Sequence, residues 1–396
     1  MLKVTPFHPR TAALMEGQAW RRWAGYVVAS SYELQHDREY HAIRSAAALF
    51  DVSPLFKYLV RGRDAARLLD RVVTRDVSKA KPCQVLYTPW CDGDGKVIDD
   101  GTVSRLDERT FRMTSADPNL RWLRMNAVGM EVSIEDVSDA TAALSLQGPL
   151  SRGILECATE RDLGGLRYFR LTSASVRGVP VHVSRTGYTG DLGYEIWMRA
   201  EDALPVWDAL IEVGTPYGIT PAGILALDVA RIEAGLLLIE VDYISSHRAL
   251  IEAQKSSPFE LNLGWTVSLD KAARFVGKAA LAAEHALGPA WRFVGLRVDW
   301  DSLEALFAEV GLSPRLPTTA WRTSVPVYAG ARQVGYATSG CWSPLLKQYI
   351  ALAHVEAAHA KPGTPLAMEV TVEHRRKQAT AYVRKTPFFD PPRKRG

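Results

Sequence analysis

The sequence predicts an α+β fold, and three observations support this prediction. Up to about residue 285, helical and strand patterns are mixed without the regular βαβ alternation of a doubly wound sheet. After residue 285, short apolar runs are separated by Pro and Gly, which is typical of an antiparallel β domain. The 396 residues, 47% of them hydrophobic, are enough for roughly two or three domains, each with its own core.

The elements of the first part follow one another in a readable order. Residues 38–53 have apolar side chains at helical spacing and then enter a strand, and residues 63–77 form a second amphipathic helix. Residues 84–106 are two strands joined by the turn Asp92-Gly93-Asp94-Gly95. A strand and a helix follow at 110–128, then strands around 182–197 and two helices at 202–214 and 221–235.

Composition excludes several classes of function. The net charge is +4, and basic residues are interspersed with acidic ones, so we expect no nucleic-acid partner. The basic end, residues 391–396, is interpreted as a solvated terminus. No apolar run is long enough to span a bilayer and no signal peptide is evident, so we expect a cytoplasmic protein without a membrane partner. The four cysteines are scattered, and we expect no metal site.

Residues 182–197, HVSRTGYTGDLGYEIW, place three glycines three apart between two strands. The spacing matches neither the dinucleotide fingerprint nor the phosphate loop. Strand alternation puts Glu195 and Trp197 on one face, with Tyr194 and Ile196 on the other. Glu195 either faces water or is held for a ligand, because a carboxylate can accept two parallel N–H donors such as the edge of a pterin ring.

Residues 96–103, KVIDDGTV, contain two adjacent acids that must point to opposite faces of a strand. Burial of either acid without a partner is costly, so one lies at an exposed edge or in a polar pocket. We expect Gly101 to leave room for a ligand beside Asp99. Asp228 and Arg231 lie three apart on a predicted helix, where they can pair across its surface.

Eight motifs, taken in order, resemble those of the aminomethyltransferase family. This family comprises the glycine-cleavage T-proteins, folate-dependent demethylases and the C-terminal halves of dimethylglycine and sarcosine dehydrogenases. The resemblance covers nearly the whole chain. The motifs are LFDVS (49–53), KVIDDGTV (96–103), LQGP (146–149), SRTGYTGDLGYEI (184–196), ARIEAGLLL (230–238), LGWTV (263–267), FVGKAAL (275–281) and GYATSGCWSPLLKQYIALAHV (335–355).

The resemblance implies three domains arranged as a cloverleaf around a central tetrahydrofolate site. We expect residues 1–50 and 140–270 to form the core of the folate-binding domain. Residues 51–139 are expected to form an inserted α+β domain that completes the folate site, and residues 275–396 a β-rich C-terminal domain.

The resemblance also implies roles for individual residues. Asp99 matches the catalytic aspartate near the folate nitrogens, and Glu195 matches the acid that binds the pterin edge. The other residues expected to bind the cofactor tetrahydrofolate are Tyr87, Tyr188, Trp265 and Arg231. One departure is Leu227, which stands where the T-proteins have an arginine that touches folate.

The donor side of the expected pocket departs further from the family. Residues 22–32, RWAGYVVASSY, keep Gly25 and Tyr32 but little else of the T-protein motif, and residues 301–321 look like an insertion. We expect the donor to be bound by Arg22, Tyr26, Ser31 and Tyr32. Arg22 either faces the cavity, where it favours an anionic small donor, or is an exposed residue of the sequence AWRRW.

Three functions are compatible with the sequence. The first is a tetrahydrofolate-dependent transferase that moves a one-carbon unit from a small donor to tetrahydrofolate. The second is a demethylase that transfers the methyl group of an N-, S- or O-methyl compound to tetrahydrofolate. The third is a folate-binding protein without catalytic activity. A carrier protein or a dehydrogenase is a further candidate partner.

Overall fold

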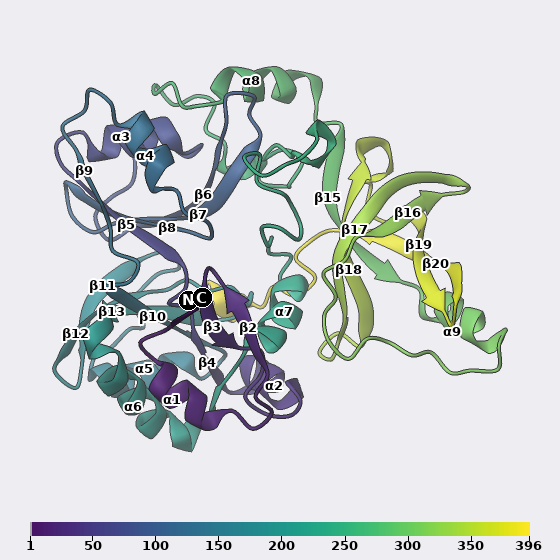
Figure 1. Cartoon of the computed structure of the whole chain (residues 1–396), viewed down its shortest axis with the longest axis horizontal. Helices are drawn as coiled ribbons and strands as arrows, with labels where there is room; N and C mark the ends of the chain where they lie inside the picture. The colour runs from purple at the N-terminus through teal and green to yellow at the C-terminus, as the bar shows by residue number, and fades with distance from the viewer. Residues whose placement is uncertain (1) are drawn as a thin grey trace.

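The computed structural model describes residues 2–396 and confirms the α+β prediction (Figure 1). A six-stranded sheet lies at the centre of the first unit and is antiparallel except for the pairing of β4 with β14. Its strand order is β11 (Leu171–Val176), β12 (Val179–Ser184), β13 (Gly193–Arg199), β10 (Thr141–Gln147), β4 (Ala47–Asp51) and β14 (Ile219–Pro221).

One face of this sheet is buried under helices. α5 (Ser151–Thr159) and α6 (Ala203–Gly214) pack there, and the core includes Tyr194 and Ile196 from β13. A small sheet of β1 (Lys3–Val4), β3 (Tyr26–Ala29) and β2 (Trp20–Trp23) and the helices α1 (His8–Thr11), α2 (Asp37–Ser45) and α7 (Ile224–Glu233) complete the unit.

A five-stranded sheet forms the second unit, with strand order β6 (Val85–Cys91), β7 (Val97–Arg105), β8 (Thr110–Ser115), β5 (Phe56–Arg61) and β9 (Ser133–Asp136). α3 (Ala65–Val72) and α4 (Leu120–Asn126) cover one face, where Val103 and Met113 are part of the core. Later in the chain, Ser246 and Ser256 bond to the backbone of Val97, and α8 (Lys278–Leu287) contacts the turn at Gly95.

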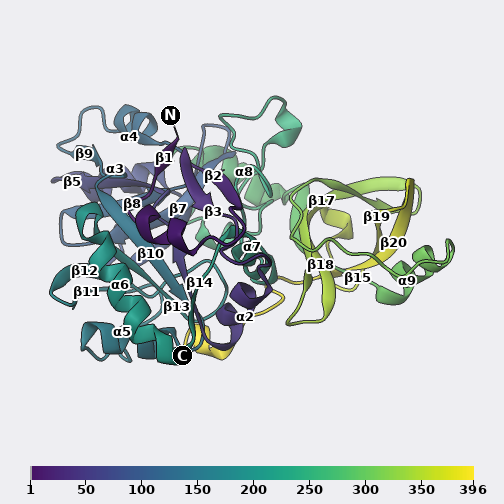
Figure 2. The same cartoon turned by 60° about the horizontal axis from the view of Figure 1, so that its bottom comes forward.

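The C-terminal part is a closed six-stranded barrel, which confirms the expected β-rich domain (Figure 2). Its strand order is β15 (Trp291–Val298), β18 (Gln348–Glu356), β17 (Arg332–Ser343), β16 (Val325–Ala329), β19 (Pro365–Val372) and β20 (Arg375–Arg384). α9 (Trp300–Ala308) lies between the first two barrel strands in the sequence. After β20 the chain returns to the first unit, where the backbone N–H groups of Phe388 and Phe389 each donate to the Glu233 carbonyl at 2.9 Å.

Within residues 2–396 no helix combines the length and the apolar character that a bilayer crossing requires.

Candidate functional site

The two large sheets turn polar faces toward each other. Strand alternation and register put Tyr87, Asp100, Thr102 and Arg112 on the face of the five-stranded sheet opposite to α3 and α4. On β13, Glu195 and Trp197 occupy the face opposite to α5 and α6. The Arg112 guanidinium lies 4.0 Å from the centre of the Trp197 ring, so the two faces are in contact.

Asp100 is the centre of a cluster with two tyrosines. Its Oδ2 accepts a hydrogen bond of 2.8 Å from the Tyr87 hydroxyl, and its Oδ1 accepts one from the Tyr243 hydroxyl. Burial raises the pKa of Asp100, and the two phenol donors oppose that shift. Burial, followed by the charge of Asp100, also raises the pKa of both tyrosines, which keeps their hydroxyls protonated as donors.

Aromatic side chains extend from this cluster to the surface. Trp265, in the short turn Gly264–Thr266, stacks on Tyr87 with ring centroids 6.2 Å apart and is 64% exposed. The Arg75 guanidinium lies 5.4 Å from the Trp265 ring centre. Tyr188 is partly buried, and its hydroxyl donates to the Leu237 carbonyl. The structure therefore brings Tyr87 and Trp265 together and places Tyr188 beside the segment that leads to Tyr243.

Asp99 is not part of this cluster, contrary to our expectation. It is fully buried on the face that packs against α3 and α4, and it accepts hydrogen bonds from Asp100 N at 2.8 Å, Asp117 N at 3.0 Å and Asn119 Nδ2 at 2.9 Å. Burial, followed by the charge of Asp100, raises its pKa well above the ordinary value. Asp99 thus anchors the loop before α4.

The space expected beside Gly101 is absent. A Cβ atom at this position would lie 2.0 Å from the Thr114 carbonyl oxygen. The glycine is required because β8 approaches β7 closely at this point, and it leaves no room for a ligand. That expectation was wrong because the space left by the absent side chain of a glycine can be occupied by a neighbouring backbone as readily as by a small molecule.

Glu195 lies in a second polar cluster on β13. Its Oε2 accepts a hydrogen bond of 2.6 Å from the Thr186 hydroxyl, which is 2.8 Å from the Ser184 hydroxyl. Burial raises the pKa of Glu195, while the Thr186 bond and the positive charge of Arg112 lower it. A hydrogen bond from the Ser184 hydroxyl also lowers the pKa of Glu195, and a carboxylate has about four lone-pair positions, so it has capacity for further donors.

The three glycines of the turn 187–193 serve packing. A Cβ at Gly187 or Gly193 would lie 2.1 Å from the side-chain amide of the buried Gln147. Gly190 has a φ of +75°, and a Cβ there would lie 2.5 Å from the Ala234 methyl group. The glycine spacing therefore reflects the close fit of the turn around Gln147 and against α7, and the segment that enters the turn carries Thr186, which bonds to Glu195.

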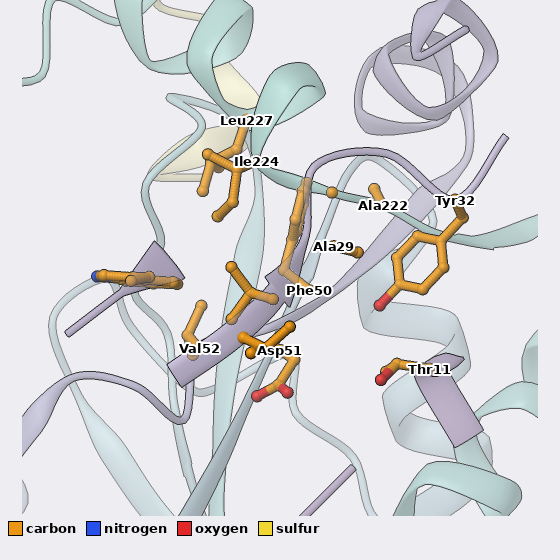
Figure 3. A pocket seen from close by; sticks show the side chains of 13 residues that line it. Thr11, Ala29, Tyr32, Phe50, Asp51, Val52, Ala222, Ile224 and Leu227 are labelled. Atoms are coloured by element: carbon orange, nitrogen blue, oxygen red, sulfur yellow. The ribbon is translucent and has the colours of Figure 1, made fainter. Parts of the chain in front are cut away.

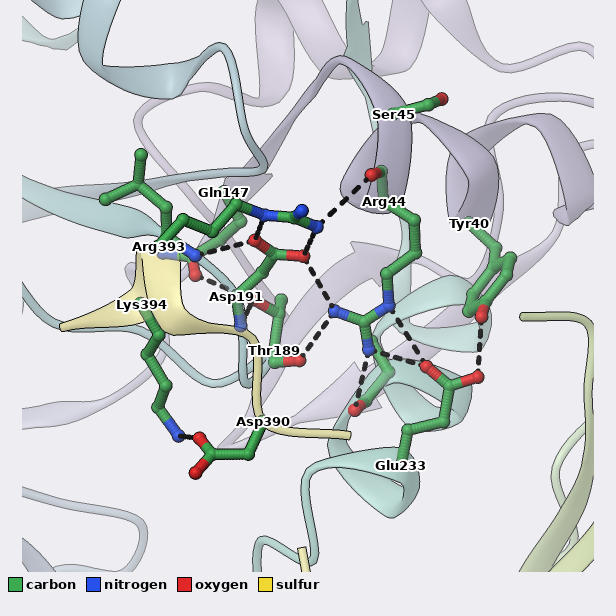
Figure 4. Close-up of polar contacts among 12 residues, drawn as sticks. Tyr40, Arg44, Ser45, Gln147, Thr189, Asp191, Glu233, Asp390, Arg393 and Lys394 are labelled. Atoms are coloured by element: carbon green, nitrogen blue, oxygen red, sulfur yellow. Dashed lines mark hydrogen bonds and ion pairs between the residues drawn. The ribbon is translucent and has the colours of Figure 1, made fainter. Parts of the chain in front are cut away.

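A buried network of charges fixes this turn in place (Figure 4). Asp191, in the turn, is held by Arg393 through two bonds of 2.6 and 2.8 Å. Arg44 on α2 donates to the Thr189 carbonyl at 3.0 Å and pairs with Glu233 at 2.6 Å. The interpretation of residues 391–396 as a solvated end holds only in part, because Pro392, Arg393, Arg395 and Gly396 are exposed but Arg393 is also the principal partner of a buried aspartate.

Arg231 is fully buried beneath the segment that carries Tyr243. Its Nη1 pairs with Asp242, and its Nε lies 3.4 Å from Asp228 Oδ1, which is the pairing expected across the helix. The structure thus gives Arg231 a clear part in supporting Tyr243. Leu227 is buried and lines a small cavity with Tyr32 and Asp51 (Figure 3).

The expected donor residues are not brought together. Tyr26 donates to Asp139, and Ser31 donates to the Glu33 carbonyl at 2.9 Å. Ser31 lines a separate cleft of about 560 Å³ between α2, α7 and the segment after α9. Tyr32 is buried with its ring in the small cavity of Figure 3. Arg22 is exposed, so the second of the two alternatives for this side chain is the one observed.

Arg21, the neighbour of Arg22, points toward Asp228, and the sequence did not lead us to expect this. Arg21 Nη1 lies 3.9 Å from Asp228 Oδ2, and Arg322 Nη2, from the barrel domain, lies 2.5 Å from the same oxygen. Alternation along β2 was the signal that could have distinguished the two arginines, because the strand has only one face toward α7.

Comparison with known proteins gives one consistent family. The model of the GCVT N-terminal domain matches residues 7–271, and that of the glycine cleavage T-protein C-terminal barrel domain matches residues 309–390. An aminomethyltransferase of Bacillus pumilus is 34% identical over 395 residues, which are 98% of this chain and 99% of the relative. One of Streptomyces avermitilis is 35% identical over 352 residues, 88% of each chain.

A solved structure shows the same fold. The crystal structure of glycine cleavage system aminomethyltransferase T from Bartonella henselae superposes with a TM-score of 0.83. The two sequences are 24% identical, and the match covers 98% of this chain and 99% of the other.

Proposed function

The chain belongs to the glycine cleavage T-protein family of aminomethyltransferases, and on that premise we propose that it transfers a one-carbon unit from a small donor to tetrahydrofolate. The family uses tetrahydrofolate, and its members are transferases, so this chain is an enzyme. The folate-binding protein without activity is therefore set aside.

One observation carries the proposed site: Glu195 and Asp100 lie on two polar sheet faces that contact each other through Arg112 and Trp197. The Glu195 carboxylate has acceptor capacity beyond its bond from Thr186 and can accept the 2-amino and N3 hydrogens of a pterin. The residue types therefore fit a reduced folate, with Tyr87 and Trp265 as the aromatic wall along it.

Asp100 then takes the catalytic role that the family motif had suggested for its neighbour. Tetrahydrofolate accepts the one-carbon unit at a ring nitrogen, and positive charge develops there during transfer. A carboxylate in a buried site stabilises such a charge far better than water does. The hydroxyls of Tyr87 and Tyr243 orient the Asp100 carboxylate. Either hydroxyl can donate a proton to Asp100 or accept one from it.

The donor side is proposed to be the region of Arg21 and Arg322. These two cations lie around the carboxylate of Asp228, and Arg231 is shared between Asp228 and Asp242, so three cations face two carboxylates. The excess positive charge favours a small donor that carries an anionic group. Whether the one-carbon unit leaves such a donor as methylene or as methyl distinguishes aminomethyl transfer from demethylation. A carrier or dehydrogenase partner remains an alternative source of the unit.

Product identification tests the proposal. The protein is incubated anaerobically with tetrahydrofolate and a panel of aminomethyl and N-, S- and O-methyl compounds, and the folate product is identified by mass. We expect a folate one carbon heavier with at least one anionic donor. 5,10-Methylenetetrahydrofolate supports aminomethyl transfer, and 5-methyltetrahydrofolate supports demethylation. Absence of any one-carbon folate with every donor, although tetrahydrofolate binds, would contradict the proposed function.

A further inference from the structure

Arg112 is a buried cation without a partner. The residue is 4% exposed, and its Nε is buried with no hydrogen-bond partner among residues 2–396. Its guanidinium is stacked on Trp197 rather than bonded to a carboxylate. Unpaired charges are expensive to bury, so a folded protein rarely keeps one unless a ligand or a partner uses it.

The direction of the side chain indicates where such a ligand lies. Arg112 extends from β8 across the space between the two polar faces and ends over Trp197, which is two residues beyond Glu195 on the same face of β13. Glu195 is the one acidic group whose charge acts on Arg112 within the described residues. Within residues 2–396, Arg112 and Glu195 nevertheless form no ion pair. Burial lowers the pKa of Arg112 to about 10.

The neighbouring groups do not satisfy the guanidinium either. His182, which pairs with Trp197 across the strands, has its pKa lowered by burial and by the charge of Arg112. An imidazole is neutral or positively charged, so it supplies no negative charge to Arg112. The Trp197 indole N–H donates to Ser184 at 3.3 Å and leaves the ring face to the cation. An acceptor that belongs to a ligand is thus the missing element.

Tetrahydrofolate presents a matching pattern. The edge of its pterin ring carries the 2-amino and N3 hydrogens next to the 4-oxo oxygen, so two donors are followed directly by a strong acceptor. A carboxylate is an acceptor only, and a guanidinium is a donor only. Glu195 and Arg112 together therefore offer the complement of the whole edge.

We infer that Arg112 donates to the 4-oxo oxygen of tetrahydrofolate and thereby makes the site specific for 4-oxopterins. This inference rests on the proposed folate site and adds a specificity-determining residue to it. A cation held in a dry site rejects a ligand that presents N–H donors in place of the oxygen, because the charge is then both unpaired and repelled. The 4-amino folates are such ligands.

The melting temperature of an Arg112→Met variant distinguishes an arginine that binds a ligand from one that only stabilises the fold. Replacing Arg112 with Met removes an unpaired buried charge and keeps much of the apolar contact with Trp197. The ligand-free variant is therefore expected to melt at the same temperature as the parent protein or higher, whereas a purely structural arginine would lower the Tm. The affinity for tetrahydrofolate is expected to fall about 10- to 100-fold, the scale of one charge-assisted hydrogen bond.

The test measures the dissociation constants of tetrahydrofolate and of tetrahydroaminopterin, which has an amino group in place of the 4-oxo oxygen. The proteins are the parent, Arg112→Met, Arg112→Lys and the control Arg297→Met. Arg297 is a matched control because its Nε is also buried and unpartnered and it lies over Tyr382, but in the barrel. The parent is expected to prefer tetrahydrofolate, and Arg112→Met to reduce that preference at least about tenfold.

Part of the preference is expected to persist in Arg112→Met, because Glu195 still recognises N3. Arg112→Lys, which keeps one cation, is expected to retain an intermediate preference, and Arg297→Met the full one. An unchanged preference in Arg112→Met would overturn the inference while leaving the folate site in place. A parent protein that does not bind tetrahydrofolate would overturn the proposed function and this inference with it.

Discussion

Substitution of the two adjacent aspartates separates catalysis from stability. Asp99 accepts hydrogen bonds from two backbone N–H groups, which cannot become acceptors, and from the Asn119 side-chain amide. The Asn119 amide is held in this orientation because its Oδ1 accepts from Trp90 Nε1 at 3.0 Å and its Nδ2 also donates to the Asp117 carbonyl at 3.0 Å. In Asp99→Asn one of the oxygens becomes an amide NH2 that faces an N–H group, so at least one buried donor loses its acceptor. The free energy of unfolding is then expected to fall by about 1–3 kcal/mol, reduced in part by the removal of a buried charge.

Asp100 differs because its two partners are phenols. A hydroxyl can accept as well as donate, so Tyr87 or Tyr243 can turn its O–H away and accept from the new amide in Asp100→Asn. The fold is therefore expected to keep its stability. The carboxylate charge at the transfer site is lost, and the rate is expected to fall about 10²- to 10⁴-fold.

The assay combines urea denaturation with single-turnover transfer rates, using the donor found by product identification. Asp99→Asn is expected to lower the denaturation midpoint and to transfer at close to the parent rate under native conditions. Asp100→Asn is expected to show the opposite pattern. If Asp99→Asn lost transfer as severely as Asp100→Asn while keeping the parent midpoint, the assignment of the two faces of β7 would be refuted.

Three further predictions follow from the charges and aromatic groups of the site. Burial raises the pKa of Glu195, and only its ionised carboxylate accepts two donors. On acidification, the affinity for folate should therefore begin to fall at a higher pH than the titration of an ordinary glutamate would give. An affinity that stays constant until ordinary glutamates titrate would contradict this prediction. Arg393→Met leaves buried Asp191 with Arg44, 3.4 Å away, as its remaining cation among the described residues, and should lower the free energy of unfolding by about 1–3 kcal/mol in urea titrations. An unchanged midpoint would argue against a stabilising role of the Arg393–Asp191 pair. Trp265→Ala should weaken tetrahydrofolate binding roughly tenfold by fluorescence titration without changing the Tm, since the side chain is 64% exposed, and full affinity would remove it from the site.

Periodicity predicted the broad architecture because it depends only on which face of an element is apolar. The mixed elements, the strand pair around residues 92–95 and the β-rich C-terminal part all follow from such patterns. Strand alternation also placed Glu195 and Trp197 together on one face, as the structure has them.

What could not be predicted depends on partners far away in the sequence. The alternation of Asp99 and Asp100 is evident, but which face points to the ligand depends on α3 and α4, whose positions only tertiary packing sets. Gly101 had the same ambiguity, since its empty side could have faced either a ligand or β8. The role of Arg393 required knowledge that the chain returns from the barrel to residue 191.

The central claim is that a reduced folate lies between the two facing sheets with its pterin edge on Glu195. Titration calorimetry of tetrahydrofolate with the parent, Glu195→Gln and the control Glu212→Gln tests it most directly; Glu212 is an exposed glutamate paired with Arg177. The glutamine variant turns an amide N–H toward a pterin donor, so its affinity should be about 10- to 100-fold weaker, and the control should bind like the parent. Equal affinity of all three proteins for tetrahydrofolate would contradict the account.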